Sequence, residues 1–297
     1  MSLIGHADLS SFASFAAIDW SGQAVARPAG LALALASAGD AAPELIAPPG
    51  GWSRPAIVDW LIQLAQSGSR TLIGLDLSPA LPFVDQAAYF PGWDASPQNG
   101  PALWALVDHL TQEDPHLAST SFLAHPEARR HFRQSGDCGD LFGSGRGRLR
   151  VCEVVQRRMA FSPYSCFNLV GAAQVGKSSL TGMRVLHRLR GHIPVWPFDP
   201  IPESGPLIVE IYTTIAARTA GIRAGLSKIR DGATLDSALI ALESQPHTPL
   251  VRYSDHATDA ILTAAWLRRA APDQRLWTPP DLTPEIAQTE GWTFGCI

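Results

Sequence analysis

Two apolar segments of this chain end in aspartate, and the segments around them limit the folds that the chain can adopt. "FAAID" covers residues 15–19, and "TLIGLDLS" covers residues 71–78, with Asp76 as its acid. The second segment is apolar on both faces, which is typical of a strand inside a helix-covered parallel sheet. Two further short apolar runs lie between them, at 30–37 and 43–48, separated by turns with Gly and Pro. The start of the chain therefore predicts a meander of three strands and a separate fourth strand.

The residues between the third and the fourth of these strands have the pattern of an amphipathic helix. Ser53 can cap the N-terminus of this helix, and Pro55 suits its first turn. Gly68 then marks its end. The apolar side chains that recur at helical spacing are Ile57, Trp60, Leu61 and Leu64. The predicted order of elements is β-β-β-α-β.

The middle of the chain, from about residue 80 to 205, lacks this regularity. Pro and Gly interrupt it at short intervals, and helical patterns appear near 101–112 and 147–160. We therefore interpret residues 1–297 as a single domain that carries a large insertion.

Regular patterns return in the last third of the chain. An apolar strand is predicted at 205–214, and a helical stretch follows at 215–230. The last long helix is predicted from its N-cap, Ser254, to about Ala270, with Pro272 just beyond its end. Its buried stripe consists of Ile261, Leu262, Ala265 and Trp266.

Composition narrows the class of protein further. Hydrophobic residues make up 46% of the chain and charged residues 17%, which is enough apolar material for a large core. No segment approaches the ~20 apolar residues of a membrane helix, and the first residues lack the basic start and cleavage pattern of a signal peptide. We therefore expect a cytoplasmic protein without a membrane partner. The four cysteines are too far apart for a CxxC pair, so thiols are expected and no structural zinc is indicated.

Positive charge is concentrated in one stretch, although the net charge of the chain is −4. Eight arginines lie between Arg129 and Arg158, against three acidic residues. This excess indicates a phosphate-binding patch, with Arg146 and Arg148 as candidate ligands. The alternative is ordinary solvated surface, because most basic loops have no ligand. The negative net charge argues against a surface built entirely for nucleic acid.

Both central strands of the predicted sheet end in an acid, Asp19 in the first and Asp76 in the fourth. Ligands of an open α/β sheet collect at the carboxyl ends of its strands, and neighbouring strands lie about 4.8 Å apart. Two aspartates in these positions can share one cation. A third acid, Glu210, lies inside the apolar run "LIVEIY". A buried acid needs a partner, so Glu210 indicates either a functional group or a salt bridge to an arginine.

The start of the last helix, in "SDHATDAILTAAW", supplies three more candidates. Asp255 and Asp259 are four residues apart, and His256 and Asp259 are three apart, so each pair shares a helical face. An acid in the first turn also offsets the helix dipole without any other role, which is a sufficient explanation of Asp255. Asp259 lies in the second turn beside the buried stripe, where a carboxylate needs a partner.

This order of elements, with acids at the ends of two strands and at the start of the last helix, is the layout of an RNase H-like fold. "FAAIDWSG", "LIGLDLS", "VEIYTT", "SDHATDAILTAAW" and "TEGWTFG" resemble, in this order, the signature stretches of a domain-of-unknown-function family of predicted RNase H-like nucleases, in the Holliday-junction-resolvase-like branch of the fold. The resemblance covers most of the chain. It implies an α/β fold with a mixed five-stranded sheet in the order 3-2-1-4-5, flanked by helices.

We therefore expect a nuclease that hydrolyses phosphodiester bonds with a carboxylate cluster and Mg²⁺ or Mn²⁺. Oxygen-rich ligands favour these ions over zinc. The expected catalytic residues are Asp19, Asp76, Glu210 and Asp259. The expected metal ligands are Asp19, Asp76, Asp255, His256 and Asp259, with Asp19 as the bridging ligand. Nucleic acid is the expected partner. The sequence does not decide between DNA and RNA, or whether the chain forms a homo-oligomer.

The stretch "GAAQVGKSS", from Gly171 to Ser179, has the spacing of a Walker A phosphate loop. A working loop follows a strong parallel strand, whereas polar side chains interrupt residues 165–170, "SCFNLV". In the family that the chain resembles, this segment is a glycine-rich turn and helix within the fold. We therefore expect a tight turn before a helix at 177–190, with Lys177 as a phosphate ligand at the positive end of that helix.

Three other functions stay open. The first is a P-loop nucleoside triphosphatase. The second is a sugar-kinase-like or actin-like ATPase, because "DWSG" and "DLSP" resemble its phosphate loops, although Ser21 and Ser78 stand where those proteins have glycine. The third is a non-catalytic RNase H-like binding or scaffold protein, in which some of the acids pair with arginines.

Overall fold

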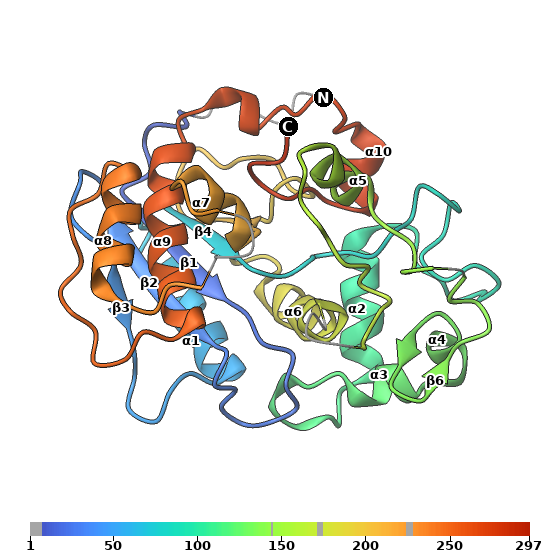
Figure 1. The fold of residues 1–297 in the computed structure, drawn as a ribbon. Helices are drawn as coiled ribbons and strands as arrows, with labels where there is room; N and C mark the ends of the chain where they lie inside the picture. The colour runs from blue at the N-terminus through green and yellow to red at the C-terminus, as the bar shows by residue number, and fades with distance from the viewer. Residues whose placement is uncertain (1–7, 144, 171–174, 224–227) are drawn as a thin grey trace.

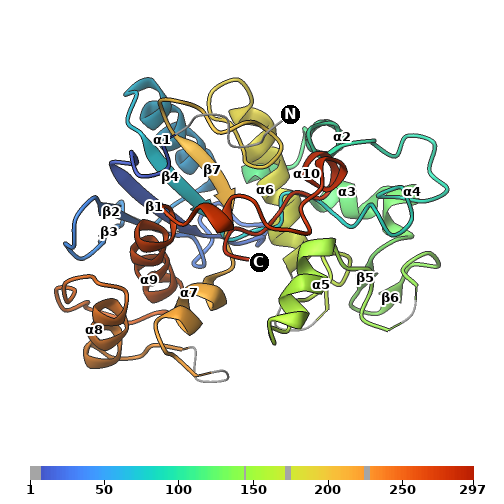
Figure 2. The ribbon, with the colours of Figure 1, turned by 90° about the horizontal axis from the view of Figure 1, so that it is seen from above.

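The computed structural model describes residues 8–297, except residues 144, 171–174 and 224–227. Its main sheet has five strands in the order β3-β2-β1-β4-β7; Figure 1 labels the first four of these, and Figure 2 also labels β7. The strands are β1 (Ser14–Asp19), β2 (Ala32–Ser37), β3 (Glu44–Ile46), β4 (Thr71–Leu75) and β7 (Leu207–Glu210). β2 is antiparallel to both β1 and β3, whereas β1, β4 and β7 run parallel. The predicted α/β class and strand order are confirmed, with β7 as the fifth strand of the sheet.

Helices cover both faces of this sheet (Figure 2). On one face, α9 (Asp255–Ala270) packs across β1 and β2. Beside it lie two short helices, α7 (Thr213–Thr219) and α8 (Gly232–Ala241). The other face is covered by α6 (Val175–Leu189), which packs against both α1 (Arg54–Gln66) and α2 (Gly100–Leu110).

Alternate residues of β1 face the two helical layers. Phe15 and Ala17 belong to the core under α9, whereas Ala16 and Ile18 belong to the core on the side of α1 and α6. All four side chains are buried. Burial on both faces explains why the strand has a continuous apolar run instead of an alternating one.

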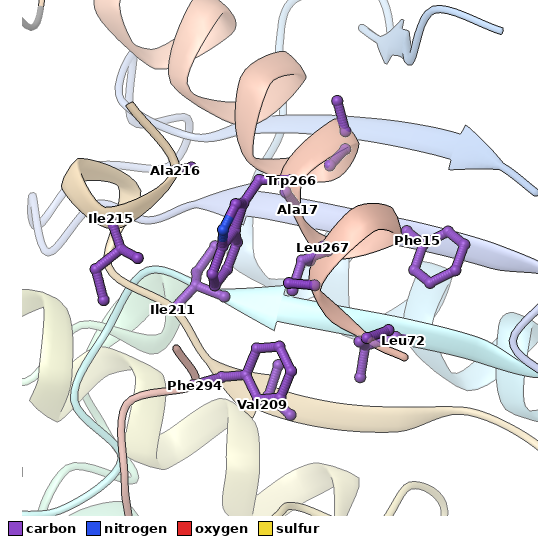
Figure 3. Close-up of a cluster of buried hydrophobic side chains, with 14 of the residues drawn as sticks. Phe15, Ala17, Leu72, Val209, Ile211, Ile215, Ala216, Trp266, Leu267 and Phe294 are labelled. Atoms are coloured by element: carbon purple, nitrogen blue, oxygen red, sulfur yellow. The ribbon is translucent and has the colours of Figure 1, made fainter. Parts of the chain in front are cut away.

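The core under α9 is packed around Trp266 (Figure 3). The centroids of the Trp266 and Phe294 rings lie 5.9 Å apart. Leu267 and Ile211 approach the backbone of Gly74 in β4, where an added Cβ would lie 2.9 Å and 2.6 Å from their side chains. Glycine at this position therefore lets α9 and the segment after β7 close over the central strand.

The predicted starts of α1 and α9 are confirmed by their caps. Ser53 Oγ accepts a hydrogen bond from the Ala56 N–H at 3.2 Å, and Ser254 Oγ accepts one from the Ala257 N–H at 3.3 Å. The whole predicted stripe of α9 is buried. The buried stripe of α1 is narrower than predicted, because Trp60 and Leu64 are only half-buried.

Between β4 and β7 the chain leaves the main sheet. The helical stretch predicted at 101–112 corresponds to α2, and the helix predicted at 177–190 corresponds to α6. The helix predicted at 147–160 is shorter than expected and is limited to α5 (Val151–Arg158). The other elements of this region are the 3₁₀ helix η1 (Pro115–Leu117), α3 (Thr120–Ala124), α4 (Pro126–Arg129) and a hairpin of β5 (Arg133–Gln134) and β6 (Asp137–Cys138).

The predicted length of the helical stretch at 215–230 is wrong. α7 ends at Thr219, because Gly221 adopts a left-handed φ of 83° and turns the chain. A separate helix, α8, follows, which the sequence pattern did not predict. Its N-cap is Asp231, whose Oδ1 accepts a hydrogen bond from the Thr234 N–H at 2.8 Å. The strand predicted at 205–214 is likewise shorter and is limited to β7.

The chain ends with the 3₁₀ helix η2 (Gln274–Leu276), α10 (Pro284–Thr289) and a final segment along β7. In this segment the Phe294 N–H donates to the Glu210 carbonyl at 2.9 Å. All four cysteines are free thiols, as expected. None of the helices in the described part of the chain is long and apolar enough to cross a bilayer.

Candidate functional site

The carboxyl ends of β1 and β4 carry Asp19 and Asp76 side by side. Asp19 is the last residue of β1. Asp76 directly follows β4, and its N–H donates to the Ile18 carbonyl at 3.0 Å. The parallel register that pairs Ile18 with Leu75 places Asp19 and Asp76 at adjacent positions of the two strands. The structure thus brings together the two acids that the sequence places at this edge of the sheet.

α9 brings two more of the candidate residues to the same edge. His256 lies in its first turn, and His256 Nδ1 is 2.6 Å from Asp19 Oδ2. Asp259 lies one turn further along the helix. Burial first, and then the negative charges of Asp19 and Asp255, raise the pKa of Asp259 to about 7. Asp259 is therefore close enough to Asp19 for the two charges to repel each other.

Crowding of these acids also affects the protonation of the other carboxyl groups. Burial raises the pKa of Asp76 well above its usual range, and the charges of Asp19, Asp259 and Glu210 add to this effect. Burial likewise raises the pKa of Asp19, although the hydrogen bond and the charge of His256 oppose it. Both carboxyl groups therefore hold their protons more strongly than a free aspartate does.

Among the residues that the structure describes, no three His, Cys, Asp or Glu side chains are arranged as a set of metal ligands. Asp19 is engaged by His256. The chemistry of the group nevertheless suits a hard divalent cation, because carboxylate oxygens are the donors that Mg²⁺ and Mn²⁺ prefer. A bound cation would also relieve the repulsion between the acids. The residue types therefore suit Mg²⁺ or Mn²⁺. The contacts that Asp19 now makes would have to change for the ion to bind.

Glu210, a candidate catalytic residue, is held in a buried ion pair. Arg150 Nη1 donates to Glu210 Oε2 at 2.8 Å, and Arg150 Nη2 donates to Glu210 Oε1 at 2.5 Å. The Thr293 hydroxyl donates to the same Oε1 at 2.8 Å. The side chains of Arg150 and Glu210 are only 1% and 5% exposed. Both carboxylate oxygens are therefore occupied, and the catalytic assignment of Glu210 is corrected to the salt bridge that was its alternative.

Arg150 joins several distant parts of the chain. Besides Glu210, it donates to Glu153 Oε1 at 3.0 Å, to Ser78 Oγ at 3.1 Å and to the Glu290 carbonyl at 3.0 Å. This role was not predictable from the arginine-rich stretch, because nothing in it distinguishes Arg150 from its neighbours. The one available signal was Glu153, three residues later, at the start of an amphipathic helix.

Asp255, a candidate metal ligand, is engaged by cations of the chain itself. Lys228 Nζ lies 2.9 Å from Asp255 Oδ2, and Arg230 Nη1 lies 2.5 Å from Asp255 Oδ1. Partial burial opposes ionisation of this carboxyl, but Lys228 and Arg230 outweigh it and lower the pKa of Asp255. The metal-ligand assignment of Asp255 is therefore corrected to that of an ion-pair partner at the start of α9.

Most of the arginine-rich stretch is neutralised within the protein. The arginines that form ion pairs are Arg129, Arg130, Arg148, Arg150 and Arg158. Arg148 binds Asp85 and the carbonyl groups of Pro82 and Ala88, and its side chain is 9% exposed. The phosphate-binding assignment of Arg148 is therefore wrong. Arg146 is exposed, but it does not line the cavity beside Asp76.

A cavity of about 930 Å³ opens beside the carboxyl groups. Asp76, Glu210 and His256 line it from the sheet edge and α9, and Lys177 and Ser178 line it from the first turn of α6. Much of the remaining wall comes from α3, the β5–β6 hairpin and α5. Binding sites for small molecules have volumes of about 300–1,000 Å³, so this cavity is large enough to hold a ligand.

The first turn of α6 lies directly against the loop that follows β1. An added Cβ at Gly22 would lie 2.3 Å from the Lys177 carbonyl carbon and 2.4 Å from the Ser178 nitrogen. This close contact brings Lys177 to the same cavity as Asp76. Within the described ranges, no acidic side chain lies within ion-pair distance of Lys177. Lys177 is therefore a cation of the cavity wall that is available to a ligand.

The Walker-like stretch lacks the strand that a nucleotide loop requires. Gly171 and the three residues after it lie outside the described residues. Before them, residues 165–170 contribute an isolated bridge between Asn168 and Arg133 and no strand of the main sheet. At Gly176 an added Cβ would lie 2.0 Å from a backbone oxygen of the preceding segment, so close packing explains this glycine. Phosphate binding by Lys177 stays a prediction.

Comparison with known proteins gives no independent assignment. No family model matches the sequence, and neither a curated protein nor a solved structure was found to be similar to the chain.

Proposed function

We propose that this protein is an RNase H-like nuclease that depends on a divalent metal ion. The observation that carries the proposal is the position of Asp19 and Asp76 at the carboxyl ends of two neighbouring parallel strands, beside a cavity that Asp76 lines. Asp259 comes from α9, which packs across β1, and its charge adds to the effect of burial on the pKa of Asp76. Burying several acids close together costs stability, so a cluster of this kind indicates a counter-ion or a function. The strand order and the position of α9 across β1 are consistent with the RNase H-like layout.

Asp19, Asp76 and Asp259 are the residues that would hold the cation. When bound, Mg²⁺ or Mn²⁺ would supply the positive charge that activates a water molecule and offsets the negative charge of a phosphodiester. Binding requires Asp19 and Asp76 to be ionised, because metal ligands must be deprotonated.

His256 is suited to proton transfer, and we assign it this role instead of direct metal binding. Its Nδ1 is held by Asp19, which fixes the orientation of the ring. The opposite ring nitrogen, Nε2, is then available on the side chain that lines the cavity. A histidine in this position can give a proton to the leaving oxygen of a phosphodiester.

Lys177 would bind the phosphate group of the substrate. It lines the cavity together with Asp76, and its charge is not neutralised by an ion pair within the described residues. A phosphate held between Lys177 and the carboxylate site would present its phosphorus to an activated water molecule.

The two nucleoside triphosphate alternatives have less support. A P-loop enzyme needs a strand before the loop, and residues 165–170 do not supply one to the main sheet. Sugar-kinase-like ATPases use two copies of the domain, whereas the described residues contain only one five-stranded sheet, besides the β5–β6 hairpin. A non-catalytic binding or scaffold protein is the alternative that experiment has to separate from the nuclease.

Cleavage assays test the proposal. Labelled single-stranded, duplex, hybrid and four-way-junction substrates are incubated with Mg²⁺ or Mn²⁺, with EDTA as the metal-free control. We expect metal-dependent cleavage that Asp19→Asn lowers by about 100-fold or more. Asp59→Asn, which changes an exposed aspartate of α1, is the matched control and should keep full activity. Absence of cleavage with every substrate and both metals would leave the binding or scaffold function.

A further inference from the structure

The cavity beside Asp76 has an aromatic wall. Tyr164, in the segment after α5, and Tyr212, between β7 and α7, both line the cavity. The two tyrosines therefore belong to the same cavity as Asp76.

The two rings differ in how firmly they are held. Tyr212 packs against Phe161 with ring centroids 5.7 Å apart, and Arg218 covers the Phe161 ring at 3.7 Å. Tyr164, by contrast, is 46% exposed. An aromatic side chain that stays open inside a concave site offers a flat surface for stacking.

The walls around this surface restrict what can reach it. α3, the β5–β6 hairpin and α5 rise around the cavity, so Asp76 lies in a chamber and not on a flat face. The volume of about 930 Å³ matches a small-molecule site. A duplex does not present a base to this aromatic wall while its bases stay paired. Its bases are also already stacked and would have to be flipped out to reach Tyr164.

We propose, as an extension of the proposed nuclease function, that the site takes an unpaired nucleotide of a single strand, with its base stacked on Tyr164 and its phosphate bound by Lys177. An unpaired base has a free face for stacking, and loss of one such contact weakens binding about 5-fold to 150-fold. The site therefore favours a single strand over a duplex or a four-way junction.

Fluorescence anisotropy tests this inference with the full-length wild-type protein in EDTA, where metal-dependent cleavage cannot occur. The probes are a short single-stranded DNA, the RNA of the same sequence, the DNA duplex and a four-way junction. We expect at least one single strand to bind about tenfold more tightly than the duplex. Tyr164→Ala should weaken this binding about 5-fold to 150-fold. Tyr164→Phe should preserve it, because stacking requires the ring and not the hydroxyl group.

Ile240→Ala is the control, since Ile240 is an exposed apolar residue of α8 outside the cavity. The inference is overturned if the duplex or the junction binds as tightly as the single strands, if Tyr164→Ala binds like the wild type, or if no probe binds. These readouts do not depend on cleavage. The nuclease proposal alone fails if single strands bind as expected but neither Mg²⁺ nor Mn²⁺ supports their cleavage.

Discussion

His256 Nδ1 lies 2.6 Å from Asp19 Oδ2, so the first turn of α9 is joined to the end of β1 across 237 positions of the sequence. This contact connects the helical layer to the sheet at the point where the cavity opens. The side chain of His256 is 46% exposed, whereas that of Asp19 is 9% exposed. His256 is therefore the member of the pair that a substrate can meet directly.

His256→Gln should lower cleavage with little effect on stability. Glutamine can still donate a hydrogen bond to Asp19, but it cannot transfer a proton, so we expect the rate to fall by about 10²-fold to 10⁴-fold. His109→Gln, which changes an exposed histidine of α2, is the control for both rate and Tm. A wild-type rate in His256→Gln would exclude the proton-transfer role.

Asp76→Asn should separate activity from stability. The charges of Asp19, Asp259 and Glu210 oppose ionisation of Asp76, and an amide of the same shape removes this conflict. Cleavage should be lost. The free energy of unfolding, measured with urea in EDTA, should stay unchanged or rise by up to about 2 kcal/mol. A fall of similar size would instead show that Asp76 is mainly structural.

Arg150→Met should destabilise the protein strongly. It leaves Glu210 and Glu153 buried without their shared cation, and loss of one partner of a buried ion pair costs about 3–5 kcal/mol. Arg158→Met is the control, because the exposed pair of Arg158 with Asp281 is worth at most about 1 kcal/mol. Urea unfolding measures both variants. Equal effects would mean that the buried cluster does not hold the sheet and the insertion together.

Gly22→Ala should disturb the contact between the loop after β1 and α6. The added methyl group would lie 2.3 Å from the Lys177 carbonyl carbon, so the two segments must separate, at a cost of about 1–3 kcal/mol. Cleavage should fall, because Lys177 moves relative to Asp76. Gly39→Ala introduces backbone strain at a φ of 98° with no atom within 4 Å of the added methyl group. This control should lose some stability but keep its activity, and equal activity of the two variants would contradict the role of the contact.

The sheet and the meeting of its acids were predictable because the signals are local. Asp19 and Asp76 each close a short apolar run, and Ser254 directly precedes a regular apolar stripe. Parallel strands in the centre of a sheet then place their carboxyl ends at one edge, whatever the length of the chain between them. The parallel arrangement of the strands therefore predicts that Asp19 and Asp76 lie at the same edge, although they are far apart in the sequence.

The partners of the other acids were not predictable, because they come from remote segments. Arg150 lies 60 positions from Glu210, in a stretch without apolar periodicity, so the sequence showed an acid that needs a partner but not which arginine supplies it. Arg148 reaches Asp85 across 63 positions. Because that stretch has no apolar periodicity, the sequence also did not predict which segments of the insertion line the cavity around Tyr164.

Thermal unfolding of the wild type and of Asp76→Asn during a Mn²⁺ titration is the most direct test of the claim that Asp19, Asp76 and Asp259 form one cation site. Binding to the folded state alone should stabilise the wild type by about 2.7 kcal/mol at a Mn²⁺ concentration of 100 Kd. Asp59→Asn should respond like the wild type, and Asp76→Asn should show little or no rise in Tm. A wild-type Tm that Mn²⁺ does not change, or an equal rise in Asp76→Asn, would contradict the claim.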